Sequence, residues 1–519
     1  MTRTLRSQEF KDKLLSIVAD DAPRKLVEEL AEYSLCLEQQ LILLENYRFG
    51  RSSERFVDPR QMEFFNEAEK LEAEVGEDDS ASEGTDENAA AKGDSKKKRR
   101  PKIELSEALP RNVVVHELKP EDRRCPCCDE PMAEIGAETT EKLHVVAPKI
   151  EVKCDVYKKY ACKSCQEAPA QAPRPESALS HIKASTETVA FIATQKYVFG
   201  TPLYRLEQLF SSAGVTLSRY VMSLWMIKLA GILRPVYEAL EKALLSRDYM
   251  HMDETTLQVL REPGRPATSK SQIWIRTSGV HSSQGPPIAL YTYDPSRSAA
   301  VAERLIEGFR GILQTDDYSG YSSALKGCDQ ITHVLCWDHA RRYFWEALQA
   351  ISKEKRPSST SGQALKLIGQ LYAIEEECKP MSAIDRQCVR EKLSSPVLEK
   401  LKKFCSKKLD DLSTSSPTAV AIKYMLSNWE KLTLYTTDGR INISNNPAEQ
   451  RVRPFAVGRK NFLFSNTPRG AEASAIIYSV VETMKLNGKV PLNELVRLIS
   501  LVGSKKKSEE LTIKEILPK

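Results

Sequence analysis

The sequence lacks three features that would place it among membrane proteins, secreted proteins or strongly basic nucleic-acid binders. It has no apolar run of about 18 residues, so we expect no transmembrane helix. Its N-terminal stretch MTRTLRSQEFKDKLL is charged throughout and lacks the apolar core of a signal peptide. A strong charge excess is also missing, because 76 basic and 71 acidic residues leave a net charge of only +5. The distribution of charge therefore matters more than the balance.

The chain is long and carries several cysteines. With 519 residues, 41% of them hydrophobic, it exceeds one ordinary core, and we expect about three or four structural units. Four of its 12 cysteines form two CxxC pairs. Without an export signal, such pairs favour metal binding over disulfides and indicate a reducing cytoplasm.

A heptad pattern predicts a helix over residues 24–48. Leu30, Leu37 and Leu44 are seven residues apart, whereas Gln40 interrupts the second seam. We expect a short leucine zipper that pairs two copies of the chain, with an amphipathic helix packed on its own chain as the alternative. An acidic stretch and the basic run KKKRRPK follow, and their composition predicts a linker without a core.

Two CxxC pairs, Cys125 with Cys128 and Cys162 with Cys165, predict a structural zinc ribbon. Strand-like stretches fill the 33 residues between them, and two CxxC turns can direct four thiolates at one tetrahedral zinc ion. The ion replaces a core that is too small to be stable alone. Because four thiolates leave no open coordination position, we expect no catalysis there. An accidental cysteine cluster or a redox pair is the alternative.

The next region resembles a helix-turn-helix. A short amphipathic helix covers residues 203–210, a turn ends at Gly214, and the stretch from Val215 opens a second helix that runs through Trp225. The region is expected to contact DNA, or to be a plain helical hairpin in a core.

Alternating strand and helix patterns in the centre of the chain predict a catalytic α/β domain. Three strands, a helix, a strand, a short helix, a strand and a helix follow one another, which is the order of the ribonuclease-H-like fold. A charged helical block between about residues 352 and 429 is expected to be an insertion in it. The strands are expected at residues 248–260, 272–276, 288–293, 311–315 and 332–336, and the helices at 299–309, at 321–326 and from 340.

Three acids are candidate catalytic residues. The first and fourth strands of this fold are neighbours, so Asp253 and Asp316 would converge. Glu449 lies in the first turn of a helix that the turn Ser444-Asn445-Asn446-Pro447 is expected to start, with an asparagine as its cap. Three carboxylates repel one another in a dry site. Two magnesium (or manganese) ions remove that cost and activate a water or a 3′-hydroxyl.

Each of these acids has an ordinary alternative role, at a strand edge, in a turn or in a first helical turn. Glu254 and Asp317 are rivals, because strand alternation lets only one member of each adjacent pair face the site.

Other polar residues near these acids are candidates for phosphate contact. His339, at the end of the fifth strand, is expected to position a phosphate or a leaving group, or to be structural. A zinc site with Cys336 is conceivable, but the sequence offers it no further ligands. The cations expected to hold DNA are Arg341, Arg342, Arg451, Arg453, Arg459 and Lys460, although Arg453 and Arg459 could equally pack on the catalytic core.

Taken together, these motifs closely resemble the IS66 family of insertion-sequence transposases. The matching stretches are HMDETTLQVL, TDDYSGY, CWDHARRYF, NNPAEQRVRPFAVGRKNFLFS and IIYSVVETMKLNG, and the likeness extends to PLYRLEQLF, CPCC, CKSC and FGRSSER. The resemblance implies a DDE-type domain of ribonuclease-H-like fold with Asp253, Asp316 and Glu449 as the acids. Asp316 fits the family pattern of Asp, any residue, Tyr. Gln450 departs from it, since an arginine is usual there.

We therefore expect a magnesium-dependent DNA transposase that cleaves the ends of its own element and transfers them to target DNA. Its expected partners are element-end and target DNA, further copies of itself and accessory proteins from the same element, in a prokaryotic, nucleoid-associated cytoplasmic location. A zinc-ribbon DNA-binding accessory or regulatory protein without chemistry is one alternative, and a plain ribonuclease-H-like nuclease is another.

The expected architecture is a multidomain α/β protein. A ribonuclease-H-like catalytic domain with a helical insertion follows a coiled-coil helix, a zinc ribbon and a helix-turn-helix-like region. The expected bounds are 1–68 for the zipper region, 69–103 for the linker, 104–175 for the ribbon, 176–245 for the helical DNA-binding region, 246–350 and 431–488 for the catalytic domain, 351–430 for the insertion and 489–519 for a C-terminal element.

Overall fold

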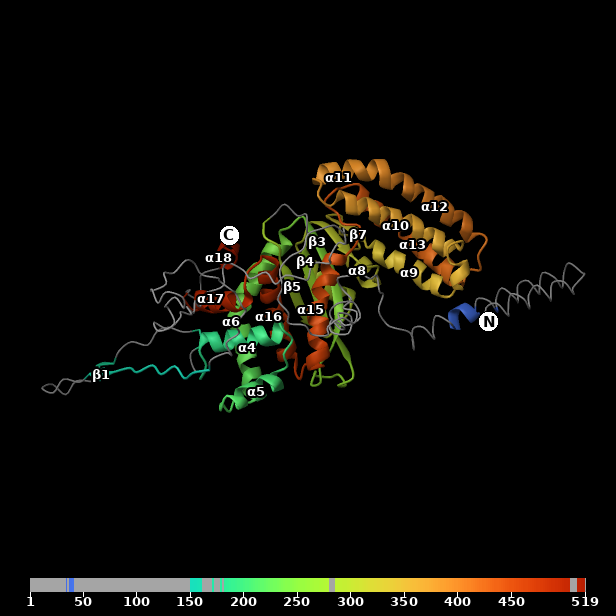
Figure 1. Cartoon of the computed structure of the whole chain (residues 1–519). Coiled ribbons are helices and arrows are strands. Elements are labelled where there is room, and N and C mark those ends of the chain that lie inside the picture. The colour runs from blue at the N-terminus through green and yellow to red at the C-terminus, as the bar shows by residue number, and fades with distance from the viewer. Residues whose placement is uncertain are drawn as a thin grey trace, which may run out of the picture. The chain divides into compact units, whose positions relative to one another are not determined.

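The computed structural model describes residues 34, 37–41, 150–160, 170–171, 178–179, 182–279, 285–504 and 511–518 (Figure 1). The four cysteines of the expected zinc ribbon, the linker and most of the expected zipper helix lie outside these residues. Within the described part, no helix combines the length and apolar character needed to cross a membrane. A small antiparallel sheet joins β1 (Lys159–Tyr160) to β2 (Ala170–Gln171).

A five-stranded mixed sheet lies at the centre of the described α/β region. Its strand order is β5-β4-β3-β6-β7. β3, β4 and β5 are antiparallel neighbours, whereas β6 runs parallel to β3 and β7 runs parallel to β6. The strands are β3 (Tyr249–Gln258), β4 (Lys270–Ser278), β5 (Ala289–Asp294), β6 (Gly311–Thr315) and β7 (Ile331–Leu335).

The predicted alternation of strands and helices is confirmed in this region. The three antiparallel strands are followed by α7 (Ala299–Ile306), β6, α8 (Ser319–Ala324), β7 and α9 (Trp337–Gln349). The first and fourth strands of the sheet are neighbours, as expected. Their close approach requires a glycine, because a Cβ on Gly311 would lie 2.3 Å from the carbonyl oxygen of Asp248.

The helical region before the sheet consists of α4 (Thr186–Tyr197), α5 (Leu203–Ser212) and α6 (Arg219–Leu245). The second helix of the expected helix-turn-helix begins later and is much longer than predicted. Its N-cap is Ser218, whose hydroxyl accepts a hydrogen bond from the Val221 N–H at 3.4 Å. Buried apolar residues continue along α6 as far as Leu244, so this helix belongs to the core of the α/β region.

The larger core joins α6 to the sheet and to the C-terminal helices α16 (Pro468–Leu486), α17 (Pro491–Ser504) and α18 (Ile513–Ile516). α16 is buried along most of its length, so apolar residues occur on all of its faces and not on one stripe. In Figure 1, α6 and α16 lie beside β5, an edge strand of the sheet.

Two hydroxyls on α16 satisfy the backbone of that edge strand. The Thr483 hydroxyl accepts a hydrogen bond from the Ala289 N–H and donates one to the Ala289 carbonyl, both at 3.0 Å. One helical turn earlier, the Ser479 hydroxyl accepts from the Tyr291 N–H at 2.7 Å. Unpaired edge groups normally need water or another strand. Ser479 and Thr483, four residues apart on α16, lie opposite Tyr291 and Ala289, two residues apart on β5. The buried helix therefore covers this edge of the sheet.

Thr483→Val is expected to lower the free energy of unfolding by about 1–3 kcal/mol, because valine keeps the shape but leaves the buried Ala289 backbone groups unpaired. Urea unfolding followed by tryptophan fluorescence measures the change. Ser500→Ala is the control: the Ser500 hydroxyl is exposed on α17 and bonds only to its own helix, so its removal should cost little. Equal stability of both variants would show that α16 does not stabilise the strand edge in this way.

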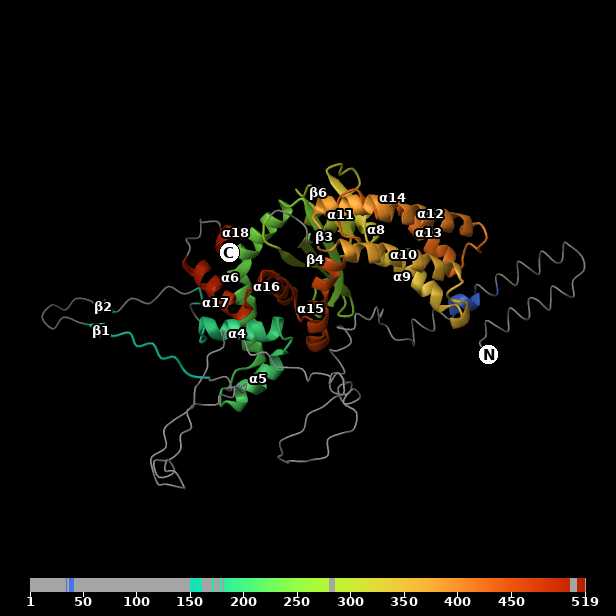
Figure 2. The ribbon, with the colours of Figure 1, turned by 45° about the horizontal axis from the view of Figure 1, so that its top comes forward.

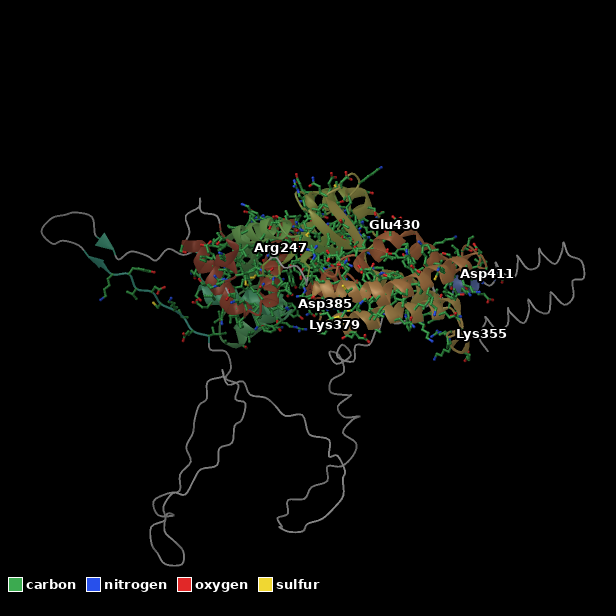
Figure 3. The ribbon with its side chains drawn as sticks, turned by 90° about the horizontal axis from the view of Figure 1, so that it is seen from above. Arg247, Lys355, Lys379, Asp385, Asp411 and Glu430 are labelled. Atoms are coloured by element: carbon green, nitrogen blue, oxygen red, sulfur yellow. The ribbon has the colours of Figure 1, made fainter. Side chains whose placement is uncertain are left out.

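A helical block separates β7 from the segment that completes the site. The predicted helical character of this block is confirmed, and α10 to α13 lie together in it (Figure 2). Its own core includes Trp337, Val334 and Tyr249 from the sheet side, and charged side chains such as Lys379 and Asp411 are exposed on its outside (Figure 3). Its elements are η3 (Lys353–Lys355), α10 (Thr360–Cys378), α11 (Ala383–Val389), η4 (Arg390–Ser394), α12 (Ser395–Leu409), α13 (Pro417–Ser427), α14 (Trp429–Thr433) and η5 (Leu434–Thr436).

Candidate active site

Asp253, on β3, and Asp316, directly after β6, lie at corresponding places along two neighbouring parallel strands. The last registered pair of β3 and β6 is His251 with Gln314, and each acid lies two residues beyond its member of that pair. Burial raises the pKa of Asp253 well above its usual value, and the nearby charges of Glu254, Asp316 and Glu449 raise it further. The structure therefore brings all three predicted acids into one electrostatic environment, in which the charged form of Asp253 is disfavoured.

The two rival acids have other partners. Glu254 receives hydrogen bonds from the Arg297 guanidinium, with its Nε at 2.7 Å, and from the Tyr321 hydroxyl. Burial raises the pKa of Glu254 against the effect of these hydrogen bonds. Asp317 accepts a hydrogen bond from the Asn428 amide at 2.7 Å, which directs it toward the helical block.

α15 (Asn446–Phe462) carries Glu449 in its first turn. The expected cap is only partly right. Asn445 occupies the N-cap position, but its side chain makes no capping hydrogen bond. Instead its amide donates to the Met252 carbonyl at 3.0 Å, and its amide oxygen lies 2.9 Å from Nδ1 of the buried His251. Asn445 thus joins the start of α15 to β3 directly before Asp253.

A buried polar network extends this connection to β6. The Tyr249 hydroxyl donates to the Gln314 side chain and accepts from the Asn442 N–H at 3.0 Å. The Gln314 amide in turn donates to the Asn442 carbonyl at 2.8 Å. These groups hold the segment before α15 across the two strands that carry Asp253 and Asp316. Because buried polar groups are costly to leave unpaired, the network fixes the position of this segment.

The other end of α15 is also attached to β3. Just beyond the helix, the Ser465 N–H donates to the Gln258 carbonyl, and the Leu260 N–H donates to the Ser465 carbonyl, each at 3.0 Å. α15 therefore follows the strand between two fixed points (Figure 1). Its position, and that of Glu449, depends on contacts at both ends.

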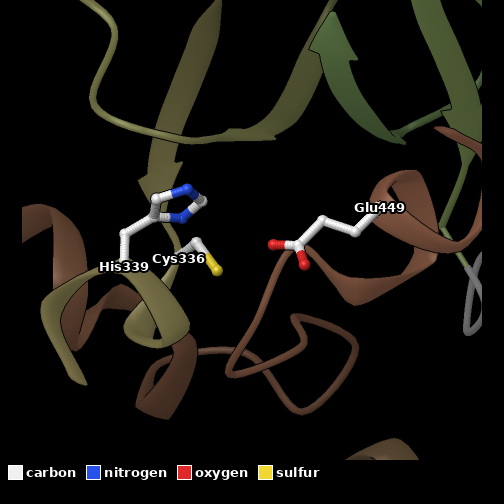
Figure 4. Close-up of side chains that lie close together, drawn as sticks. All are labelled: Cys336, His339 and Glu449. Atoms are coloured by element: carbon white, nitrogen blue, oxygen red, sulfur yellow. The ribbon is translucent and has the colours of Figure 1, made fainter. Parts of the chain in front are cut away.

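Glu449 lies close to Cys336 and His339, which follow the fifth strand of the sheet, β7. One ligand atom each from Cys336, His339 and Glu449 all lie within 4.8 Å of one another (Figure 4). Asp253 and Asp316 are not members of this group. His339, predicted as a site residue, therefore lies beside a predicted metal ligand.

The predicted DNA-binding cations on α15 divide into two pairs. Arg451 lies 3.5 Å from the buried carboxylate of Glu482 on α16, and Arg459 donates to the Thr256 hydroxyl at 2.9 Å and to its carbonyl. Burial lowers the pKa of the Arg459 guanidinium. Both arginines therefore contact the protein itself, whereas Arg453 and Lys460 are exposed.

Arg341 and Arg342, the other two predicted DNA-binding cations, lie on α9 and are half-buried. The Arg341 guanidinium lies 5.6 Å from the ring centre of Tyr372, a residue of the helical block. The hydroxyl of Tyr372 donates to Asp338 on the same first turn of α9. This end of the helical block therefore contacts the surroundings of His339.

The residues that hold the acids in place escaped prediction from the sequence. Asn445 was expected only as part of the turn that starts a helix, and no local pattern distinguishes His251, Gln314 or Asn442. The one available signal was position: His251 and Gln314 each precede a candidate acid by two residues, so strand alternation places them on the same face.

Comparisons with known proteins find models of one transposase family along the chain. A family model described as the transposase IS66 family matches residues 181–473. A second, the zinc-finger binding domain of transposase IS66, matches residues 122–166, and a third, described as transposase C of IS166 homeodomain, matches residues 36–114.

Similar curated proteins come from Sinorhizobium fredii. The uncharacterized protein y4jD is 32% identical over 407 residues, which is 77% of this chain and 78% of that protein. The uncharacterized protein y4qI is 30% identical over 505 residues, which is 95% of this chain and 90% of that protein.

Proposed function

Because the chain belongs to the IS66 family of transposases, we propose that it moves its element by DDE-type chemistry. Asp253, Asp316 and Glu449 are the three acids of this proposal. The chain would cleave the element ends and join them to target DNA in a domain of ribonuclease-H-like fold. The observation that carries the proposal is the placement of Asp253 and Asp316 by the adjacent parallel strands β3 and β6, each acid two residues beyond the last registered pair.

The topology of the sheet supports the ribonuclease-H-like assignment. Three antiparallel strands are followed by two strands parallel to the first, and the first lies at the centre of the order β5-β4-β3-β6-β7. In such a sheet, acids on the first and fourth strands are neighbours by construction. A separate helix can then supply the third acid, which is the place of Glu449 on α15.

The three acids suit magnesium, or manganese, as oxygen-only donors. Burial, and after it the charges of neighbouring acids, raise the pKa of Asp253, and a divalent cation would favour its charged form. When bound, such ions lower the barrier to in-line displacement by activating the attacking oxygen and stabilising the leaving one. The protein's own contribution is placement: Asn445 and the network around Tyr249 hold α15 against the two strands.

Two neighbouring carboxylates are assigned to the scaffold. Glu254 binds Arg297 and Tyr321, and Asp317 binds Asn428. His339 lies beside Glu449, where its imidazole can contact a phosphate oxygen or a leaving group.

Element-end DNA provides the test of this function. The purified chain is incubated with a duplex that carries the inverted repeats flanking its gene, with a second duplex as target and with magnesium. A transposase cleaves the end and produces joined strands. A plain nuclease produces cleavage without joining, and a DNA-binding accessory protein produces neither. Activity on duplexes of unrelated sequence at the same rate would also contradict the proposal.

The exposed cations of α15 are expected to contact DNA phosphates. Lys460→Ala and Arg453→Ala should each weaken binding to all sequences alike and lower the salt dependence of log K by about one unit per lost contact. Binding is measured by fluorescence anisotropy at several salt concentrations. Lys379→Ala is the control, because Lys379 is an exposed cation of the helical block. If log K depends on salt concentration equally in all three variants, α15 is not part of the DNA interface.

The N-terminal regions carry further parts of the proposal. The zinc-finger region matched at residues 122–166 includes Cys125, Cys128, Cys162 and Cys165, which we assign as ligands of a structural zinc ion. Pairing of two chains through the zipper, help from other proteins of the element and association with the nucleoid stay predictions.

A further inference from the structure

Cys336, His339 and Glu449 offer three different kinds of metal ligand in one place. The sulfur, an imidazole nitrogen and a carboxylate oxygen lie within 4.8 Å of one another, and Figure 4 shows the three side chains facing a common point. Cys336 precedes α9, His339 lies in its first turn, and Glu449 lies in the first turn of α15. The sequence shows only the CxxH pair, and the fold adds a third ligand 110 positions after His339.

The spacing is near that of a tetrahedral zinc site. Zinc–sulfur bonds of about 2.3 Å and zinc–nitrogen or zinc–oxygen bonds of about 2.0–2.1 Å place ligand atoms roughly 3.3–3.6 Å apart. From separations of at most 4.8 Å, side-chain rotations that close each gap by up to about 1.2–1.5 Å are sufficient. Three protein ligands leave a fourth position for a water or a phosphate oxygen.

The backbone already orients the sulfur. The Asn445 N–H donates to Cys336 Sγ at 3.0 Å, and hydrogen bonds of this kind orient metal ligands and tune the bound metal. Asn445 directly precedes α15, so one turn of the chain positions both Cys336 and Glu449. The Trp337 N–H also donates to the Ile443 carbonyl at 3.1 Å, which ties the start of α9 to the same segment.

We propose that Cys336, His339 and Glu449 form a site for a thiophilic divalent ion, with zinc as the best fit. A thiolate ligand selects zinc over magnesium, and the thiol proton is released to solvent on binding. The site shares Glu449 with the proposed magnesium site but not Asp253 or Asp316. A zinc ion here keeps the Glu449 carboxylate on the α9 side, so zinc occupancy inhibits the enzyme. Inhibition rests on the proposed function, whereas binding of the ion does not.

Metal content tests the site without DNA chemistry. The full chain is stripped of metal with a chelator and loaded with Zn²⁺ or Co²⁺, and the bound metal is counted for the wild type, Cys336→Ser, His339→Ala and Cys405→Ser. Cys405 is the matched control, because it is also buried but lies on α12 in the helical block. The thiolate-to-cobalt absorption band reports the sulfur ligand directly.

We expect Cys336→Ser and His339→Ala to hold one ion fewer per chain than the wild type and Cys405→Ser. The cobalt band should weaken in both Cys336→Ser and His339→Ala but not in Cys405→Ser, since the predicted ribbon contributes equally to all four proteins. Equal metal content and equal spectra in all four would overturn the site. Should Cys336→Ser fail to fold, the half-buried His339 still provides the decisive deletion.

A second measurement tests the inhibition. Zinc is added to magnesium-supported cleavage of element-end DNA, and the zinc concentration for half inhibition is expected to rise about tenfold or more in Cys336→Ser but not in Cys405→Ser. Equal inhibition of both variants would show that zinc at this site is not what inhibits magnesium-supported cleavage. If no variant cleaves DNA at all, the proposed function fails, while the metal count still decides whether the site exists.

Discussion

Asp253→Asn and Asp316→Asn are each expected to lower strand transfer by a factor on the order of 10³ or more. Asparagine keeps the size of the side chain but removes the charge that holds a divalent cation. Cation stabilisation of the transition state is worth several kcal/mol, and about 1.4 kcal/mol corresponds to a factor of ten. Cleavage and joining of element-end DNA are measured separately in magnesium.

Asp317→Asn is the matched control for this prediction. Asp317 differs from Asp316 by one position, and its carboxylate accepts a hydrogen bond from Asn428. We expect this variant to keep strand transfer within about tenfold of the wild type. An inactive Asp317→Asn beside an active Asp316→Asn would transfer the ligand role to Asp317.

Thermal unfolding separates lost chemistry from lost folding in Asp253→Asn. Burial raises the pKa of Asp253 well above its usual value, with further contributions from three neighbouring acids. A carboxyl with a raised folded-state pKa lowers stability progressively as the pH rises from its unfolded pKa to its folded one. At neutral pH, the metal-free variant is therefore expected to unfold at the same or a higher temperature than the wild type. Magnesium should stabilise the wild type more than the variant.

A lower unfolding temperature for metal-free Asp253→Asn would contradict this account. It would mean that the Asp253 charge stabilises the metal-free fold, so that burial and the neighbouring acids do not disfavour it.

Arg390→Ala is expected to lower the free energy of unfolding by about 3–5 kcal/mol. Arg390 is fully buried and forms a bidentate ion pair with Glu375, with N–O distances of 2.8 and 2.6 Å. It also donates to the Tyr435 carbonyl at 2.6 Å and to the Asp438 carbonyl at 3.0 Å. Alanine leaves Glu375 and these carbonyls without their donor inside the protein, and a buried unpaired charge is the costly part of that change.

The position of Arg390 gives this loss a consequence for the site. Tyr435 and Asp438 lead directly into Arg440, which pairs with Asp248 next to β3, and into the segment that starts α15. We expect hydrogen exchange to increase in the helical block and in residues 435–445 before it increases in β4. Urea unfolding measures the total change.

Lys408→Ala is the control for Arg390→Ala. Lys408 pairs with Asp411 in the same block, but both side chains are largely exposed, at 42% and 63%. Solvent screens such a pair, and its loss should change stability by less than about 1 kcal/mol. A double replacement of Arg390 and Glu375 by apolar residues of similar volume is expected to recover much of the loss. Similar destabilisation by Lys408→Ala and Arg390→Ala would show that the buried pair has no special role.

Much of the catalytic region was predictable because its signals are local. Strand-forming runs, a helix at Val301 and Leu305, an acid within the first run and an acid directly after the fourth follow from residue type and spacing. The adjacency of β3 and β6 was predictable as well, since few topologies accommodate that order of strands and helices. The late start and great length of α6 were not, because Ser218 and the burial along the helix decide them together.

The sequence alone determined the elements and the acids Asp253, Asp316 and Glu449 as candidates, because periodicity and residue chemistry are properties of short stretches. Only the tertiary structure decided that Glu254 and Asp317 bind other residues of the protein. It also decided which cations of α15 contact the protein itself. It also added Asn445 to the site and placed Glu449 beside Cys336 and His339. These facts depend on contacts between residues that lie from 31 to 203 positions apart. Such contacts form only when buried polar groups find partners across the fold.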